Sequence, residues 1–85
     1  IRDRCTAEEL LPLYLQQGFA LRAIRPLDSL APCFWLQADC LGQNMPPVWV
    51  PMNDRVHLAI LLAKGYAALE SRESPQGTVL ALYPV

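Results

Sequence analysis

Three cysteines and one histidine are the residues of this 85-residue chain that could serve as a nucleophile or bind a metal ion: Cys5, Cys33, Cys40 and His57. Cys33 and Cys40 lack the C-x-x-C spacing typical of zinc sites. If both lie on one strand, their odd separation directs the two thiols to opposite faces. We therefore expect structural thiols and no metal. A thiol enzyme or metal site that uses Cys33 or Cys40 with His57 is the weaker alternative.

Carboxylates are the next candidates, because hydrolytic chemistry often needs two of them held close together. Glu8 and Glu9 are better explained as first-turn helix residues, which the helix dipole favours. Asp28, Asp39 and Asp54 fall in or beside predicted turns and caps. The sequence also has no Gly-rich phosphate loop, G-x-S-x-G or H-E-x-x-H motif. These observations favour a protein that is not an enzyme and has no cofactor.

Two tryptophans carry the most informative pattern. In residues 33–40 the even positions hold Phe, Leu, Ala and Cys, and Trp35 falls on the other, mixed face. In residues 48–52 the even positions hold Val, Val and Met, and Trp49 lies opposite them. If the uniform faces meet the helices, both indoles stand on the outer side of the sheet.

The same alternation in the last strand turns its leucines at 80 and 82 inward. The predicted outer face then exposes Trp35, Trp49, Val79 and Tyr83, with Arg22 nearby. Large aromatic residues beside arginine are typical of the centres of protein interfaces. We expect these five residues to bind a partner. In the alternative, the strand phase is reversed and the tryptophans belong to the core.

A first helix should begin at Thr6, because Thr6 and Glu9 form a capping box in which each side chain reaches the other's amide. Pro12 can kink or shorten its first turns. Gly18 is expected to end the helix. A second, largely apolar helix should be capped by Asn53 or Asp54 and end in the same way at Gly65.

Strands are expected where short apolar or alternating runs lie between Gly and Pro signals: residues 19–25, 33–40, 48–52, 66–72 and 78–83. Turns are predicted at residues 27–32, 41–47 and 73–77. The segments LQQGFA (15–20) and LAKGYA (62–67) match at a spacing of 47 residues, by real symmetry or by chance.

These elements predict an α+β fold in which two helices pack on one face of a mostly antiparallel sheet of four or five strands, arranged as a tandem αββ-αββ repeat. We expect residues 1–85 to form a single domain, because the chain is too short for two cores. The chain has no initiator Met, so either it is trimmed or it is a piece of a longer protein.

Composition limits the class of partner. Apolar residues make up 53% of the chain, more than so small a domain easily hides, so we expect a protein partner, most simply a homodimer. No apolar run is long enough to span a bilayer. The net charge of −1 makes nucleic acid an unfavoured partner. The odd number of cysteines favours reduced thiols and a cytoplasmic location. Six of the seven basic residues are Arg, which fits a GC-rich, bacterial source.

One resemblance offers an alternative function. The second helix and the hairpin that follows it, up to Tyr83, are similar to the helix and wing of winged-helix DNA-binding domains. The resemblance implies a DNA-binding regulator that uses Arg55, Lys64 and Arg72. The helix departs from a recognition helix because it is apolar almost all round and offers only Arg55, His57 and Lys64 as groove contacts.

Overall fold

Antiparallel strands dominate the computed structural model, which describes residues 2–25 and 31–85. The turn predicted at residues 27–32 lies mostly outside the described residues. The elements follow in the order β1 (Arg2–Cys5), η1 (Glu8–Leu10), α1 (Leu11–Gln16), β2 (Phe19–Arg25), β3 (Cys33–Ala38), β4 (Val48–Pro51), α2 (Arg55–Ala63), β5 (Tyr66–Ser74) and β6 (Gly77–Pro84). Here η1 is a short 3-10 helix that leads into α1.

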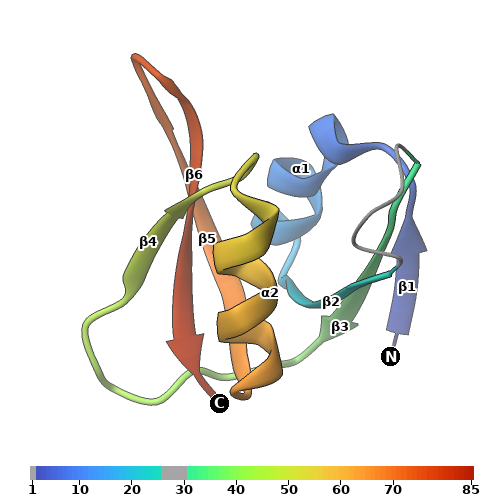
Figure 1. Ribbon diagram of the computed structural model, residues 1–85. Helices are drawn as coiled ribbons and strands as arrows, with labels where there is room; N and C mark the ends of the chain where they lie inside the picture. Colours follow the sequence, from blue (N-terminus) through green and yellow to red (C-terminus); the bar gives the residue numbers. More distant parts are fainter. Residues whose placement is uncertain (1, 26–30) are drawn as a thin grey trace.

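Within the described residues the strands form one six-stranded sheet in the order β1-β3-β2-β5-β6-β4, and every neighbouring pair is antiparallel (Figure 1). The α+β prediction is confirmed, but the predicted count of four or five strands is wrong. The missed strand is β1, whose Arg-Asp-Arg-Cys sequence has no apolar alternation. It lies at a sheet edge, where charged side chains are common because only one side is paired.

The two halves of the chain repeat one another about the centre of the sheet. Leu21 of β2 pairs with Ala68 of β5, and these residues are separated by the 47-residue spacing of the sequence repeat. Each strand also carries a bulge directly after that pair, at Arg22 in β2 and at Leu69 in β5. Because each half begins with an edge strand, the repeating unit is βαββ and not the predicted αββ.

The predicted capping box at Thr6 is wrong. Ala7 precedes η1, and no side chain caps either η1 or α1. Instead α1 begins at Leu11, which places Pro12 in the first turn, where the missing N–H costs nothing. The end of the helix agrees with the prediction, because Gly18 has a φ of 94°, a conformation that closes helices and favours glycine.

Asp54 caps α2 as predicted. Its carboxylate accepts a hydrogen bond from the backbone N–H of His57 at 3.2 Å. Gly65 ends the helix with a φ of 94°, the same value as Gly18. Leu58 and Leu61 are the buried residues of α2.

Both helices cover the same face of the sheet and share one cluster of buried residues with both halves of it. Leu11 and Leu15 of α1 and Leu58 and Leu61 of α2 pack on residues from all six strands, among them Cys5, Leu21, Ile24, Phe34, Leu36, Val50, Ala68, Leu80 and Leu82. In the described part of the chain, neither helix is long enough to cross a membrane.

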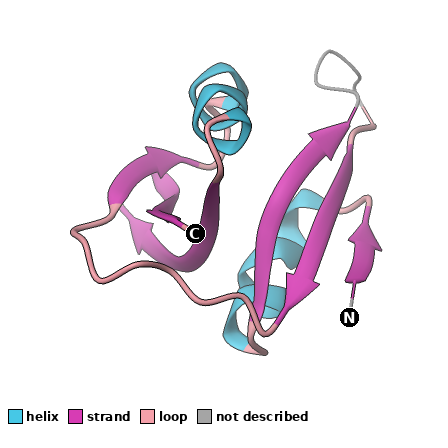
Figure 2. Cartoon of the chain, turned by 90° about the horizontal axis from the view of Figure 1, so that it is seen from below, coloured by secondary structure: helices cyan, strands magenta, loops and turns pink. Residues whose placement is uncertain are grey.

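Four strands, β3 to β6, differ in extent from the prediction. The β5–β6 hairpin turns through Pro75 and Gln76 alone, so its strands run further than expected (Figure 1). In contrast, β3 ends at Ala38. Asp39 follows with a φ of 58°, so Cys40 belongs to the connection between the halves and not to a strand. That connection runs past the end of β6 on its way to β4 (Figure 2).

Candidate binding site on the outer sheet face

Trp35 stands on the face of the sheet opposite the helices. Its neighbours in β3, Phe34 and Leu36, point into the core and are fully buried, whereas 37% of Trp35 is exposed. Strand β1 places Arg4 directly across from Trp35. The Arg4 guanidinium carbon lies 5.2 Å from the centre of the indole ring, within the range of a cation–π interaction.

Trp49 has a similar setting in the second half. Val50 beside it in β4 is fully buried, and 39% of Trp49 is exposed. Arg72 reaches from β5 over the indole, with 4.7 Å between its guanidinium carbon and the ring centre. The predicted outward phase of both tryptophans therefore agrees with their positions, and each indole already carries an arginine on its ring.

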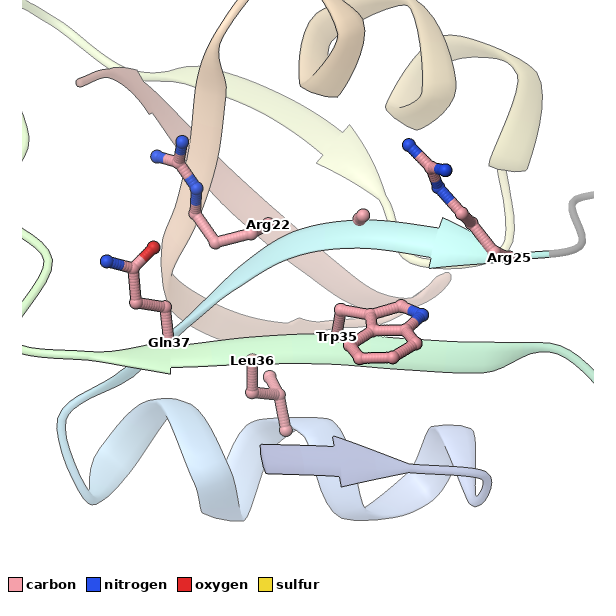
Figure 3. A pocket seen from close by; sticks show the side chains of 6 residues that line it. Arg22, Arg25, Trp35, Leu36 and Gln37 are labelled. Atoms are coloured by element: carbon pink, nitrogen blue, oxygen red, sulfur yellow. The ribbon is translucent and has the colours of Figure 1, made fainter. Parts of the chain in front are cut away.

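A hollow of about 400 Å³ opens beside Trp35, lined by Arg22, Ala23, Arg25, Trp35, Leu36 and Gln37. Ala23 of β2 pairs with Trp35 of β3, so a small side chain lies next to a large one. Figure 3 shows Arg22, Arg25, Trp35 and Gln37 on one side of these strands, whereas Leu36 points toward α1. The hollow exists because Ala23 leaves space between longer neighbours.

The bulge in β2 explains why two arginines share this hollow. In a regular strand, residues three apart point to opposite faces. The bulge at Arg22 adds one residue without a partner and shifts the alternation, so Arg22 and Arg25 both line the hollow. Arg22 also donates to the Sγ of Cys40 at 3.7 Å.

The arginines of the outer face form no ion pair with the described carboxylates, although Glu70 lies on the same face beside Tyr83. Among the described residues, ion pairs join Arg55 to Glu8 at 3.6 Å and His57 to Asp54 at 3.9 Å, both at the helices and away from the tryptophans. No described carboxylate forms an ion pair with the four arginines of the outer face, which are Arg4, Arg22, Arg25 and Arg72. The chain as a whole has a net charge of −1, so this face departs from its average.

Val79 and Tyr83 lie on the outer side of β6, as predicted, but both are only half-exposed. The Tyr83 hydroxyl lies 3.3 Å from a carboxylate oxygen of Glu70 and donates to it. Loss of solvent around the ring, followed by the charge of Glu70, raises the pKa of this phenol. Gly42 of the connection packs against Tyr83, so the chain covers part of this half by itself.

The cysteines and His57 take separate positions. Cys5 is buried and its Sγ lies 3.0 Å from the carbonyl oxygen of Ala7. Cys33 opens β3 opposite Arg25, and Cys40 meets Arg22. His57 lies in the first turn of α2 beside Asp54. Residues 2–25 and 31–85 hold no group of three His, Cys, Asp or Glu side chains placed to bind a metal ion.

Of the five residues predicted to bind a partner, Arg22 and Trp35 meet at the hollow, whereas Trp49, Val79 and Tyr83 lie on the second half. Sequence reasoning missed Arg4, Ala23, Arg25 and Gln37, and it named Arg72 only for the DNA-binding alternative. Gln37 was detectable, because it shares the parity of Trp35 within β3. The others depend on the bulge or on pairing between strands, which no local pattern records.

Comparison of the chain with protein-family models, with curated protein sequences and with solved structures gave no match.

Proposed function

We propose that this chain is a non-enzymatic protein-interaction module that binds its partner on the outer face of the sheet. The observation that carries the proposal is the pair of half-exposed indoles, Trp35 and Trp49, each with a guanidinium on its ring, on the face that no helix covers. We refer to this surface as the outer face.

The residue types support binding over catalysis. Tryptophan and arginine dominate the energetics of protein interfaces, because tryptophan buries a large rigid ring and arginine forms several directional hydrogen bonds from one planar group. Arg4 and Arg72 hold the two rings in position before any partner arrives. A partner would therefore lose little side-chain entropy in docking there.

The cysteines support a cytoplasmic module. Cys5, Cys33 and Cys40 are all free, and a reducing compartment keeps partly exposed thiols such as Cys33 and Cys40 in that state.

The test is co-purification with matched variants of the full chain. We expect the proteins retained by the wild-type chain to be lost from Trp35→Ala and Trp49→Ala, with affinities reduced about 30-fold or more per residue, the effect of an interface hot spot. Val56→Ala is the control, because Val56 is 74% exposed but lies on α2, on the opposite side of the molecule. Its retained proteins should equal those of the wild type.

Retention that is unchanged in both tryptophan variants, or that is lost equally in Val56→Ala, would contradict the proposal. Sedimentation over a range of concentrations separates a second copy from a different partner. Retention on duplex DNA that falls with added salt would favour the winged-helix alternative.

A further inference from the structure

We propose that the hollow over Ala23 receives an acidic segment of the partner protein, in an irregular extended conformation. This inference rests on the proposed function and names the partner chemistry for one part of the outer face. Its support comes from the internal symmetry of the fold and from the charge of the hollow.

The connection between the two halves shows how a segment of chain sits on this type of surface. Gly42 lies so close to the second half that a Cβ on it would be 2.7 Å from Leu69 Cδ1 and 2.7 Å from Tyr83 Cβ. The next residue, Gln43, donates from its backbone N–H to the carbonyl oxygen of Pro84 at 2.8 Å. The segment thus packs into the space between Leu69 and Tyr83, and we call such a packing position on the sheet a seat.

The equivalent seat in the first half lies between Arg22 and Gln37. Arg22 is the bulge residue of β2, as Leu69 is of β5. Gln37 pairs with Ala20, and Tyr83 pairs with Ala67, the residue equivalent to Ala20. Arg22 and Gln37 both line the hollow. Cys40 of the 39–47 connection accepts a hydrogen bond from Arg22 at 3.7 Å, but no described residue of that connection lines the hollow itself.

The symmetry of the backbone therefore provides two seats, and the chain fills one of them. The filled seat is flanked by an aliphatic and an aromatic side chain and takes a glycine. The open seat is flanked by a guanidinium and an amide, and Arg25 lies at its other end. The two seats have the same backbone shape but different flanking side chains. This difference indicates that the open seat binds a segment other than this chain's own connection.

Charge selects an acidic segment. Arg22 and Arg25 line the hollow, Arg4 lies against Trp35 at its rim, and no described carboxylate pairs with any of them. A guanidinium binds a carboxylate through paired, charge-assisted hydrogen bonds, the strongest available to these side chains. The planar indole of Trp35 provides an apolar wall for the neighbouring side chain of the segment.

The test uses random 12-residue peptides displayed on phage, selected on the immobilised wild-type chain and counter-selected on Ala23→Leu, which fills the hollow without changing its charge. We expect the selected peptides to be enriched in Asp and Glu over the starting library. Synthetic copies should bind Arg25→Gln about tenfold more weakly, with the same loss in Ala23→Leu and a smaller one in Arg22→Gln. Affinity should fall as salt is added.

Lys64→Gln is the control, because it also removes one positive charge but Lys64 is exposed at the end of α2, away from the outer face. It should leave peptide affinity unchanged. Arg25 is exposed, so its variant keeps the test valid even if Ala23→Leu folds poorly.

Peptides that lose affinity in Trp49→Ala and Arg72→Gln but not in Arg25→Gln would overturn this inference and leave the proposed function standing. A selection whose peptides respond to no change on the outer face would overturn both. If inorganic phosphate alone binds with the same affinity as the peptides, the ligand of the hollow is a small anion and the inference of a peptide segment is overturned. Self-association that Arg25→Gln abolishes would assign the hollow to a second copy and overturn the assignment to a different protein.

Discussion

Replacing Gly42 by Ala tests how the connection between the halves is held on the sheet. The added methyl carbon would lie 2.7 Å from Leu69 Cδ1, 2.7 Å from Tyr83 Cβ and 3.2 Å from Tyr83 Cγ. The end of the leucine side chain can rotate away. The Cβ of Tyr83 is bonded to the backbone of β6 and cannot move without the strand, so the connection itself has to lift from the sheet.

The magnitude follows from two opposing effects. Overpacking of a close contact costs about 1–3 kcal/mol. Alanine restricts the unfolded chain more than glycine does, which returns about 0.4–1 kcal/mol. The expected net loss in the free energy of unfolding is about 1–2 kcal/mol. For a domain of this size, that lowers Tm by about 5–15 °C.

The assay is urea unfolding of the wild type, Gly42→Ala, Leu69→Ala and the double variant. In the Leu69→Ala background the cost of Gly42→Ala should shrink by about 0.5–1 kcal/mol, because one of the two contacts is gone. It should not vanish, because the contact with Tyr83 Cβ remains. A Gly42→Ala chain as stable as the wild type would refute the close packing of the connection, and with it the filled seat used above.

Three further outcomes are expected. Asp54→Ala should lower the free energy of unfolding by about 1 kcal/mol in urea titrations, because α2 loses its cap, while the adjacent Asn53→Ala should change it little. Leu58→Ala should cost about 2–5 kcal/mol in the same assay, because Leu58 is fully buried, whereas Val56→Ala, on an exposed position of the same helix, should stay within about 0.5 kcal/mol of the wild type. The pKa of Tyr83 is raised above 10.0 in the folded chain by loss of solvent and by Glu70, so the stability it contributes is complete below that pH and is lost as pH rises through the folded value. The wild type should therefore lose more stability than Tyr83→Phe as the pH rises above 10.0, and equal losses would count against the raised pKa.

Several features of the fold could be predicted because they depend on neighbours along the chain. Gly18 and Gly65 end helices whose last turns precede them directly, and both have the positive φ expected there. Asp54 caps a helix that begins at the next residue. The Thr6 capping box fulfilled the same kind of local rule but failed, because Pro12 can occupy only the first turn and so moved the start of α1 to Leu11.

The candidate site was predictable only in part. Trp35 and Trp49 could be assigned to the outer face, since each is flanked by apolar residues that the core requires. Arg4 could not, because β1 has no pattern of its own and reaches Trp35 only through pairing with β3. Arg25 was missed because regular alternation sets it on the opposite face from Arg22.

The sequence by itself determined the α+β class, and it indicated the internal repeat and the outward side of each tryptophan, each against one open alternative. All three depend on patterns among residues close together in the sequence: the spacing of apolar residues, a glycine after a helix, and the two-residue period of a strand. Tertiary structure alone decided that β1 adds a sixth strand to the sheet and that a bulge turns Arg22 and Arg25 toward one hollow. It also decided that the connection covers part of the second half but leaves the hollow of the first half open. The reason is physical: a bulge and a strand pair are chosen by the hydrogen bonds that the partner strand offers, and that strand lies many residues away along the chain.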